Sequence, residues 1–250
     1  DADLVVEDTF YVNKQKQCQM EPHAYIAQVD GRGRLHCWSS GQMPKVTHQK
    51  IARLFDMPMS MVKIHTTTIG GGFCARLGLV SEPETCAMAL AVKGRPVKVQ
   101  TLREEDWVIS ESRHAGDYWM KIGFKKDGTP VACQARFKAN TGAYFTHASG
   151  VPFTTGAWLS GMYKFGALGY QGESYFSNQA PAGAYRGYGN PQTNFVLEQL
   201  IDRALTELDI DPVQWRLDWH KGVGDDGWCF GVKYPSCQLS ECLRQGAEAI

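Results

Sequence analysis

The sequence lacks the features that mark membrane, secreted and nucleic-acid-binding proteins. No apolar run approaches the ~20 residues that a transmembrane helix needs, and Asp1-Ala2-Asp3 does not resemble the start of a signal peptide. Lys and Arg together number 26, as do Asp and Glu, so the formal net charge is zero and no basic stripe is available for nucleic acid. We therefore expect a globular cytoplasmic protein that binds neither membranes nor nucleic acid.

Clustered cysteines are also missing, although the chain contains eight cysteines. No CxxC pair or CxxxxCxxC run occurs, and zinc and plant-type iron–sulphur sites need such clusters. We expect most of these residues to be buried, reduced thiols that act as small hydrophobes. The eight residues are Cys18, Cys37, Cys74, Cys86, Cys133, Cys229, Cys237 and Cys242.

Well-known catalytic motifs are absent as well. The sequence contains no HExxH, no phosphate-binding GxxxxGK[ST] and no nucleophile elbow. What remains is ordinary globular composition, with 43% apolar and 21% charged residues in a chain of 250. That length is enough for one or two domains with a substantial core.

Period-two alternation predicts several strands and two hairpins. The hairpins pair residues 25–29 with 34–38 and residues 118–124 with 131–137, each around a glycine-containing turn. Amphipathic patterns predict helices, whereas residues 140–172 favour loops and short helices. A strand is expected at 170–176, and the expected helices are 45–55, 81–92, 193–207, 212–220 and 239–250. The fold class is therefore α+β, with mixed sheets and packed helices in two sub-layers.

Two local signals refine this prediction. Ser81 and Glu84 have the spacing of a capping box at the start of the second helix. Glu104, Glu105 and Asp106 form an acidic group that suits a helix N-terminus. The histidines have structural explanations that outweigh functional ones, so His23, His65 and His114 are expected to be packing or hydrogen-bonding residues.

The stretch from Val62 to Arg76 runs from a strand into three glycines, Gly70 to Gly72. Such a run allows positive φ and close approach of backbone N–H groups to a bound ligand. Gly70, Gly72 and Ala75 also match a dinucleotide-binding fingerprint in spacing. The next helix begins about six residues too late, and no acidic residue closes a second strand at the usual offset. A nicotinamide-dependent dehydrogenase domain remains an alternative.

Arg186 stands within a glycine-rich loop between Tyr185 and Tyr188. A fixed cation in such a loop suits an anion or oxo group. Read with two other segments, it forms an ordered set of three loops, at 39–42, 70–73 and 183–192.

The order and spacing of these loops resemble the molybdenum hydroxylase family, which includes xanthine dehydrogenase, aldehyde oxidase and their bacterial relatives. The segments Glu21-Pro22-His23-Ala24 and Gly94-Arg95-Pro96-Val97 also look like family segments. The resemblance covers nearly the whole chain and corresponds to the first half of the large molybdopterin-binding module. We therefore expect residues 1–250 to be a fragment or one part of a larger chain or complex.

The resemblance implies a cofactor and the residues around it. The implied cofactor is Mo-molybdopterin, as such or in a dinucleotide form, and the pterin dithiolene holds the metal with no direct protein ligand. Gln42 resembles the glutamine whose amide approaches the oxygen ligands of molybdenum, and Arg186 matches the arginine beside the metal. Gly71, Gly72, Phe73 and Cys74 match the loop whose backbone faces the metal–dithiolene group.

The implied reaction is hydroxylation with water as the oxygen source. The base is a glutamate that the family places in the later half of the module, so the implied active site is incomplete in this chain. Iron–sulphur clusters and FAD on other domains or subunits would carry the electrons away. A non-catalytic scaffold that only docks partners is the second alternative.

Three positions bear on the substrate. Purine-oxidising members of the family carry an acidic residue where Leu77 stands and a substrate-facing arginine near the position of Thr154. Tyr188 occupies the place of an aromatic residue that packs against the substrate ring. A pocket of this kind lacks the charges that would orient a purine, because charge-assisted hydrogen bonds do most of that discrimination. We therefore expect an aromatic, heteroaromatic or aldehyde substrate in place of xanthine. The Ala75-Arg76 dipeptide and the stretch from Gly156 to Gly166 look closer to the branch of 4-hydroxybenzoyl-CoA reductase, and the nicotinate dehydrogenase branch is the alternative.

Overall fold

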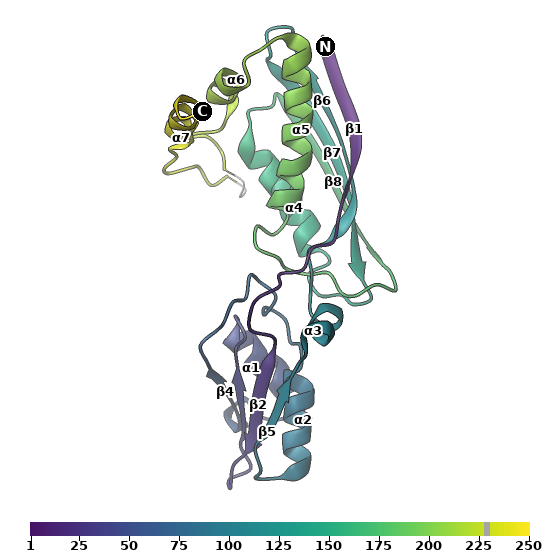
Figure 1. The fold of residues 1–250 in the computed structure, drawn as a ribbon, viewed down its shortest axis with the longest axis vertical. Helices are drawn as coiled ribbons and strands as arrows, with labels where there is room; N and C mark the ends of the chain where they lie inside the picture. Colours follow the sequence, from purple (N-terminus) through teal and green to yellow (C-terminus); the bar gives the residue numbers. More distant parts are fainter. Residues whose placement is uncertain (228–230) are drawn as a thin grey trace.

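The chain forms two lobes, each built on a four-stranded mixed sheet (Figure 1). The computed structural model describes residues 1–227 and 231–250. The chain passes between the lobes twice, through residues 13–23 after the first strand and through residues 110–114 before the sixth. These two crossings form a narrow seam between the lobes.

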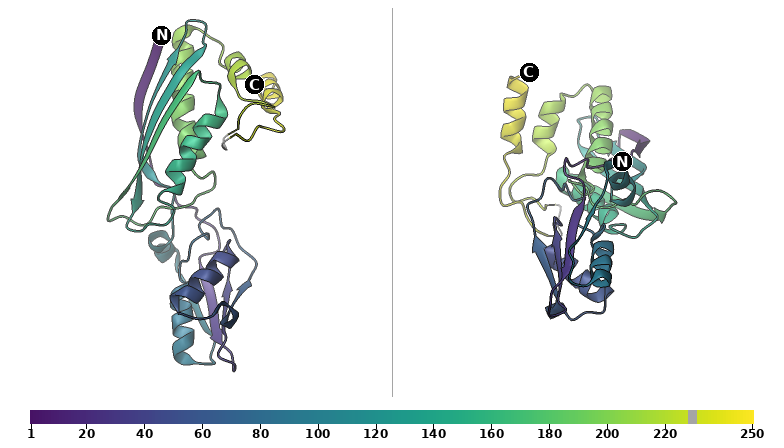
Figure 2. Two further views of the ribbon diagram at one scale, coloured as in Figure 1. Left: turned by 180° about the vertical axis from the view of Figure 1, so that it is seen from behind. Right: turned by 60° about the horizontal axis from the view of Figure 1, so that its bottom comes forward.

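The large lobe contains a sheet with strand order β1-β6-β7-β8. Its strands are β1 (Leu4–Val12), β6 (Ala115–Phe124), β7 (Pro130–Gly142) and β8 (Ala167–Phe176). Neighbours are antiparallel except for β7 and β8, which run parallel. Two helices, α4 (Gly150–Met162) and α5 (Asn190–Leu208), cover one face of this sheet (Figure 2).

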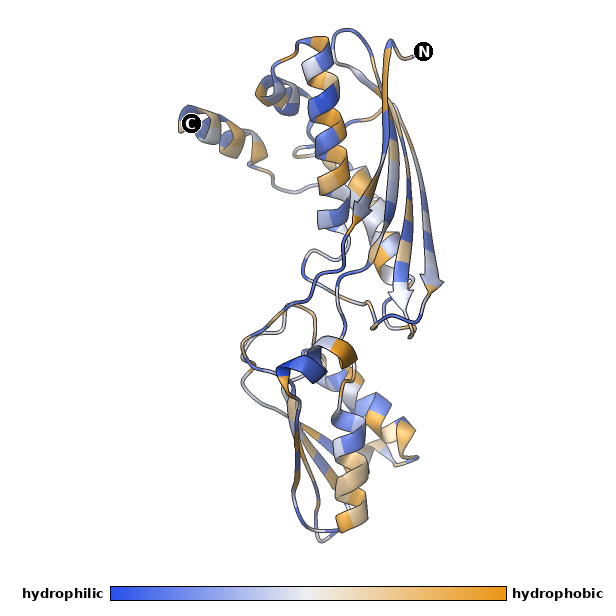
Figure 3. Cartoon of the chain, turned by 45° about the vertical axis from the view of Figure 1, so that its right-hand side comes forward, coloured by the Kyte–Doolittle hydropathy of each residue, from blue (hydrophilic) through white to orange (hydrophobic). Residues whose placement is uncertain are grey.

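Period-two alternation explains how this sheet forms its core. Tyr118, Met120 and Ile122 on β6 are fully buried, whereas Asp117 before them and Lys121 between the last two are exposed. The buried side chains pack with Leu200 and its neighbours on α5. Figure 3 shows the same alternation of hydrophilic and hydrophobic residues along the strands of the large sheet.

The small lobe contains a sheet with strand order β4-β3-β2-β5, in which only β3 and β4 run parallel. Its strands are β2 (Ala24–Val29), β3 (Leu35–Ser39), β4 (Val62–Thr66) and β5 (Val97–Gln100). Helices α1 (Pro44–Leu54) and α2 (Glu82–Val92) pack on it, and the short helices η1 (Met59–Met61) and α3 (Arg103–Ile109) flank it. Its core consists largely of small side chains, including Ala27, Cys37 and Cys86.

Two further helices, α6 (Pro212–Trp219) and α7 (Leu239–Glu248), lie beside α5 and α4 at the C-terminal end of the chain (Figure 1). Trp215 of α6 is buried in the large core, where its indole N–H donates to the Gly128 carbonyl at 2.7 Å. Across the residues that the structure describes, every helix is too short or too polar to cross a membrane.

The mixed α/β class and both hairpins are confirmed. The predicted capping box is wrong, because the Ser81 side chain makes no capping bond. The buried Glu82 carboxylate instead accepts from Ser39 Oγ at 3.0 Å and from the Val80 N–H at 2.9 Å.

Residues 140–172 are more regular than the sequence predicts. They contain the 13-residue helix α4, and β8 begins at Ala167 instead of residue 170. Glycine and aromatic residues hide the pattern of α4, since small and large side chains both pack on β8 there.

The cysteine prediction is only partly right. Cys37, Cys86 and Cys133 are buried free thiols, whereas Cys18 and Cys242 are exposed and Cys74 and Cys237 are half-buried. Cys229 lies outside the described residues.

Candidate cofactor and substrate site

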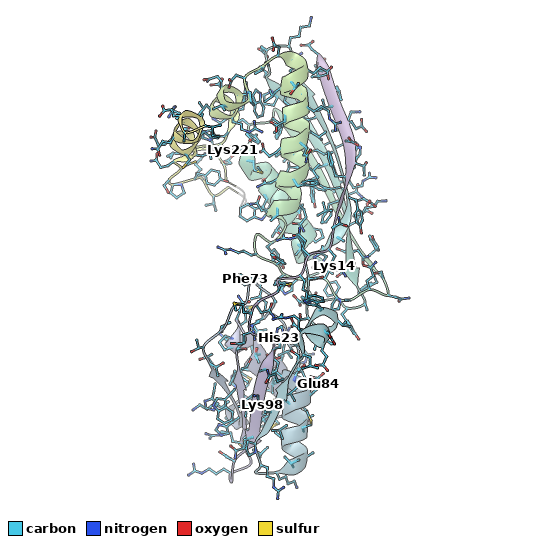
Figure 4. The ribbon with its side chains drawn as sticks, viewed as in Figure 1. Lys14, His23, Phe73, Glu84, Lys98 and Lys221 are labelled. Carbon is cyan, nitrogen blue, oxygen red and sulfur yellow. The ribbon has the colours of Figure 1, made fainter. Side chains whose placement is uncertain are left out.

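The three sequence loops meet at the seam between the lobes. The Arg186 backbone N–H donates to the Phe73 carbonyl at 3.1 Å, which joins the glycine loop to the arginine loop. The Gln42 N–H donates to the Arg76 carbonyl at 2.8 Å, which joins the first loop to the glycine loop. Figure 4 labels Phe73 at this seam, where its side chain is exposed. Segments more than 140 residues apart in sequence therefore form one surface.

Gln42 lies directly against the bare backbone of the glycine loop. Its Oε1 accepts from the Arg76 N–H at 3.3 Å, and a Cβ at Gly72 would stand 2.7 Å from the same oxygen. Any side chain at position 72 would therefore push the Gln42 amide aside. Gly71 has φ of +100°, which L-residues rarely adopt.

Left-handed backbone conformations concentrate at this seam. Phe73, Cys74 and Tyr188 have φ values of 48°, 75° and 40°, although none is a glycine. Such conformations cost on the order of 1 to 3 kcal/mol each and persist only where the surroundings enforce them. Strain at three neighbouring candidate residues points to a functional surface.

Arg76 fixes the glycine loop to the crossing segment. Its side chain is 1% exposed, its Nε donates to the Gly71 carbonyl at 2.9 Å, and its Nη2 donates to the Glu21 carbonyl at 2.6 Å. The guanidinium also contacts the Ser40 hydroxyl and forms an ion pair with the Glu21 carboxylate at 3.0 Å. A buried cation with this many acceptors holds the loop in one conformation.

A second buried arginine holds the other loop. Arg113 donates from Nη2 to the Arg186 carbonyl at 2.9 Å and from Nη1 to Gln192 Oε1 at 3.2 Å. Its guanidinium stacks over the Tyr185 ring with 4.1 Å to the centroid. The Arg186 side chain itself is exposed.

Charges near the seam act on one another. Burial raises the pKa of the Cys74 thiol, and Glu111 raises it further, while Arg113 and Arg186 act in the opposite direction. Burial also raises the pKa of the Glu111 carboxyl, which His147 opposes. Two guanidinium groups, one buried and one exposed, therefore stand close to the strained loop and favour an anionic ligand.

The backbone of the glycine loop offers donors for such a ligand. Within the described residues, the N–H groups of Gly71, Gly72 and Phe73 have no hydrogen-bond acceptor in the protein. Together with the Gln42 amide and the Arg186 guanidinium, they suit a group that carries oxygen or sulphur atoms with negative charge. The residues present therefore fit a molybdopterin group.

The three predicted substrate positions are only partly brought together. Thr154 Oγ contacts the Tyr188 carbonyl at 2.8 Å and the Gly150 carbonyl at 2.9 Å, so its hydroxyl proton is engaged within the protein. Leu77 is half-buried and continues from the glycine loop, with its N–H 3.4 Å from the Cys74 carbonyl. Their roles toward a substrate stay predictions.

The expectations for the histidines and acidic residues agree with the structure. His23 is buried with its Nδ1 against Asp106, and His65 stacks on Trp38 with 4.6 Å between ring centroids. Glu105 accepts from the Leu102 N–H at 2.7 Å at the start of α3. His114 is buried, and burial lowers its pKa to about 4.

Sequence reasoning missed the side chains that hold the loops, namely Arg76, Arg113, Glu111 and His147. Glu111, Arg113 and His147 act on a loop that is distant in sequence, and Arg76 ties the nearby glycine loop to the distant residues Glu21 and Ser40, so no local pattern marks them. The one available signal was the presence of charged residues next to the glycine loop and just before β6.

Comparisons with known proteins agree with this geometry. Residues 1–219 match the molybdopterin cofactor-binding domain. The chain is 35% identical over 261 residues to a probable hypoxanthine oxidase of Escherichia coli O157:H7. That match covers 100% of this chain and 27% of the relative. It is 32% identical over 245 residues to the molybdenum-binding subunit of xanthine dehydrogenase from the same organism. That match covers 98% of this chain and 33% of the relative. The chain therefore spans about a third or less of these relatives.

The fold also matches a solved structure closely. The aldehyde oxidoreductase of Desulfovibrio gigas superposes with a TM-score of 0.93 at 24% identity, over 99% of this chain and 27% of that one. The family match covers most of the chain and includes all three loops at the seam. This chain belongs to the molybdopterin cofactor-binding domain family of the molybdenum hydroxylases.

Proposed function

We propose that residues 1–250 form the first half of the molybdopterin-binding module of an oxidoreductase. The enzyme hydroxylates or reduces an aromatic, heteroaromatic or aldehyde substrate, and water supplies the oxygen in the hydroxylation. The observation that supports this most is the junction of the glycine loop with the arginine loop, through the Arg186 N–H and the Phe73 carbonyl. This junction gathers free backbone donors and a cation at one edge of the seam.

Each predicted residue has a distinct task in this proposal. The molybdenum cofactor supplies the redox chemistry when bound. The N–H groups of Gly71, Gly72 and Phe73 and the Gln42 amide donate to its anionic atoms, and Arg186 adds positive charge. Cys74 keeps a neutral thiol beside the loop, because burial raises its pKa. We assign Leu77, Thr154 and Tyr188 to the substrate side, as their positions in the sequence predict.

The remaining parts lie outside the described chain. The second half of the module carries the base glutamate, and iron–sulphur and flavin domains or subunits pass on the electrons. We place the enzyme in the cytoplasm, since seven described cysteines are free thiols and such thiols persist in a reducing compartment.

The two alternatives receive less support. In a dinucleotide-binding fold the helix opens at the glycines, whereas α2 begins at Glu82, ten residues after Gly72. A partner-docking scaffold does not explain the strained, donor-rich surface at the seam.

The test uses the full enzyme complex, purified and analysed for molybdenum and pterin. We expect near-equal stoichiometry of both, with turnover of at least one of benzaldehyde, nicotinate, quinoline or 4-hydroxybenzoyl-CoA, and little turnover of xanthine. Bound nucleotide without molybdenum would support the dehydrogenase alternative. Fast xanthine oxidation would contradict the substrate argument built on Leu77.

Arg186→Met tests the site within that complex. We expect turnover to fall by about 10- to 100-fold, because the guanidinium beside the cofactor is lost while the backbone junction to Phe73 remains. Arg32→Met, at the exposed tip of the β2–β3 turn, is the matched control and should leave turnover unchanged. Equal turnover by the two variants would show that Arg186 has no role at the cofactor site.

A further inference from the structure

Hydrogen bonds fix Tyr188 at its side-chain hydroxyl and at its backbone carbonyl. Its hydroxyl lies 2.7 Å from Nδ1 of His147, and its carbonyl accepts from Thr154 Oγ at 2.8 Å and from the Trp158 indole N–H at 3.3 Å. The His147 and Tyr188 rings meet edge to face, with centroids 5.6 Å apart. The phenol packs over the first turn of α4, where a Cβ at Gly150 would stand 2.5 Å from the hydroxyl oxygen.

His147 is supported in turn by Glu111, which the proposed function does not use. The Glu111 carboxylate is 3.8 Å from Nε2 of His147, a separation that allows an ion pair or a bridging water. Nδ1 therefore serves the tyrosine while Nε2 faces the carboxylate. A histidine with both nitrogens engaged has a fixed ring orientation.

Glu111 also lies between the arginine loop and Gly78, which follows the glycine loop. Its Oε2 accepts from the Ala184 N–H at 3.0 Å, within the arginine loop. A Cβ at Gly183 would fall 2.0 Å from Oε2, and a Cβ at Gly78 would fall 2.9 Å from Oε1. The carboxylate thus fills a space that two glycines leave open, one after Leu77 and one before Arg186.

The conformation of Tyr188 shows why such support is needed. With φ of 40° its backbone is in the left-handed region, and an unsupported aromatic residue would relax from it. The side chain is only half-buried, so packing alone does not fix the ring. The hydrogen bonds to its hydroxyl and to its carbonyl therefore fix the orientation of the ring.

We propose that His147 and Glu111 are positioning residues that fix the Tyr188 ring as a flat surface for an aromatic substrate. This inference rests on the proposed function, because it takes the ring to face the substrate. It narrows the substrate class to molecules with an aromatic ring, since a fixed ring favours offset or edge-to-face contact with another ring. An aliphatic substrate would gain little from this arrangement.

The test measures binding to the full, cofactor-loaded enzyme by calorimetry, with benzamide and cyclohexanecarboxamide as probes. The two amides differ in the aromatic ring, so their ratio of dissociation constants reports the ring contact. We expect His147→Ala to weaken benzamide about three- to tenfold and to change cyclohexanecarboxamide less than twofold. His147→Asn keeps a polar group near the position of Nδ1 and should restore most of the loss.

Tyr188→Phe separates a positioning role from a general structural one. It removes the hydroxyl and keeps the ring, so it should resemble His147→Ala, and the double variant should be no weaker than either single variant. Glu111→Gln keeps an acceptor for the Ala184 N–H and should give a smaller loss in the same direction. With benzaldehyde as substrate, KM should rise and kcat should change less than twofold.

Several results would overturn the inference. Additive effects of His147→Ala and Tyr188→Phe, or equal weakening of both amides, would show that His147 does not act through the tyrosine ring. His48→Ala, a half-exposed histidine on α1, should change neither constant. Failure of the proposed function would appear separately, as an enzyme without molybdenum, because amide binding needs no turnover.

Discussion

The two lobes are stabilised in different ways. The large lobe buries aromatic and large aliphatic side chains, such as Tyr118, Phe137 and Leu200, between its sheet and α5. The small lobe buries mostly alanine, cysteine and single aliphatic residues. Apolar burial stabilises in proportion to area, so the small lobe gains less from its core.

The small lobe compensates with buried polar contacts near the seam. Arg76 and Glu82 are each 1% exposed, and the His23–Asp106 pair is fully buried. These groups lie where the lobe meets the crossing segments and the glycine loop. Apolar packing holds the large lobe together, while directional hydrogen bonds set the geometry of the glycine loop.

The strongest test of this difference is Arg76→Met. It removes the donors of the Gly71 and Glu21 carbonyls and the partner of the Glu21 carboxylate. We expect a loss of about 4 kcal/mol in local stability, because breaking a buried charge network leaves its partners unsatisfied. Hydrogen exchange of peptides spanning 17–24 and 68–80 should accelerate, and the enzyme should lose molybdenum during purification.

Arg136→Met is the matched control, since Arg136 lies on the exposed face of β7. It should change exchange and metal content little, within about 0.5 kcal/mol. If Arg76→Met left the glycine loop as protected as in the parent protein, the polar network would not be what fixes this loop.

The second test is Leu200→Ala in the large lobe. Leu200 is fully buried on α5, and truncation should cost about 3 kcal/mol through lost burial and a cavity. Exchange should accelerate along α5 and β6, while peptides of the glycine loop and the molybdenum content should stay unchanged. Leu54→Ala, at a side chain that is 57% exposed, is the control. Loss of metal from Leu200→Ala at equal folded fraction would mean that the two lobes are not independent.

How far the sequence could predict the structure depends on whether two paired strands are close together in the chain. Both hairpins follow from alternation and a turn, which are local, and the sequence located them. The parallel pairs β3–β4 and β7–β8 join segments separated by helices, and no local signal specifies which strands pair. Alternation and turn residues therefore predicted the hairpin of each lobe and the parallel pair of neither.

The candidate site shows the same limit. The backbone loops and Arg186 could be found because glycine runs and an isolated arginine stand out in sequence. Glu111 and His147 could not, because their function depends on the distance between a carboxylate and an imidazole 36 positions apart. Buried polar groups become visible only when the fold brings their partners together.

The smallest expected effect concerns the seam itself, at His114. This histidine is fully buried, and the Gly183 backbone is the group that favours its charged form. Burial lowers its pKa to about 4, from an ordinary value of 6.5, and His147 and Lys14 act in the same direction. Since the unfolded chain binds the proton first, the stability contributed by neutral His114 is complete above pH 6.5 and is lost between pH 6.5 and 4.

His114→Leu removes this titration and should reduce the acid-induced loss of stability by on the order of 2 kcal/mol. Exchange of peptides spanning 110–118 and 180–186, compared at pH 6.5 and at pH 4.5, measures the difference against the parent protein. His48→Leu on α1 should leave that difference unchanged. His114 belongs to neither apolar core, so the change in hydrogen exchange should be confined to the seam. An equal change along α5 would show that the seam and the large lobe open as one unit.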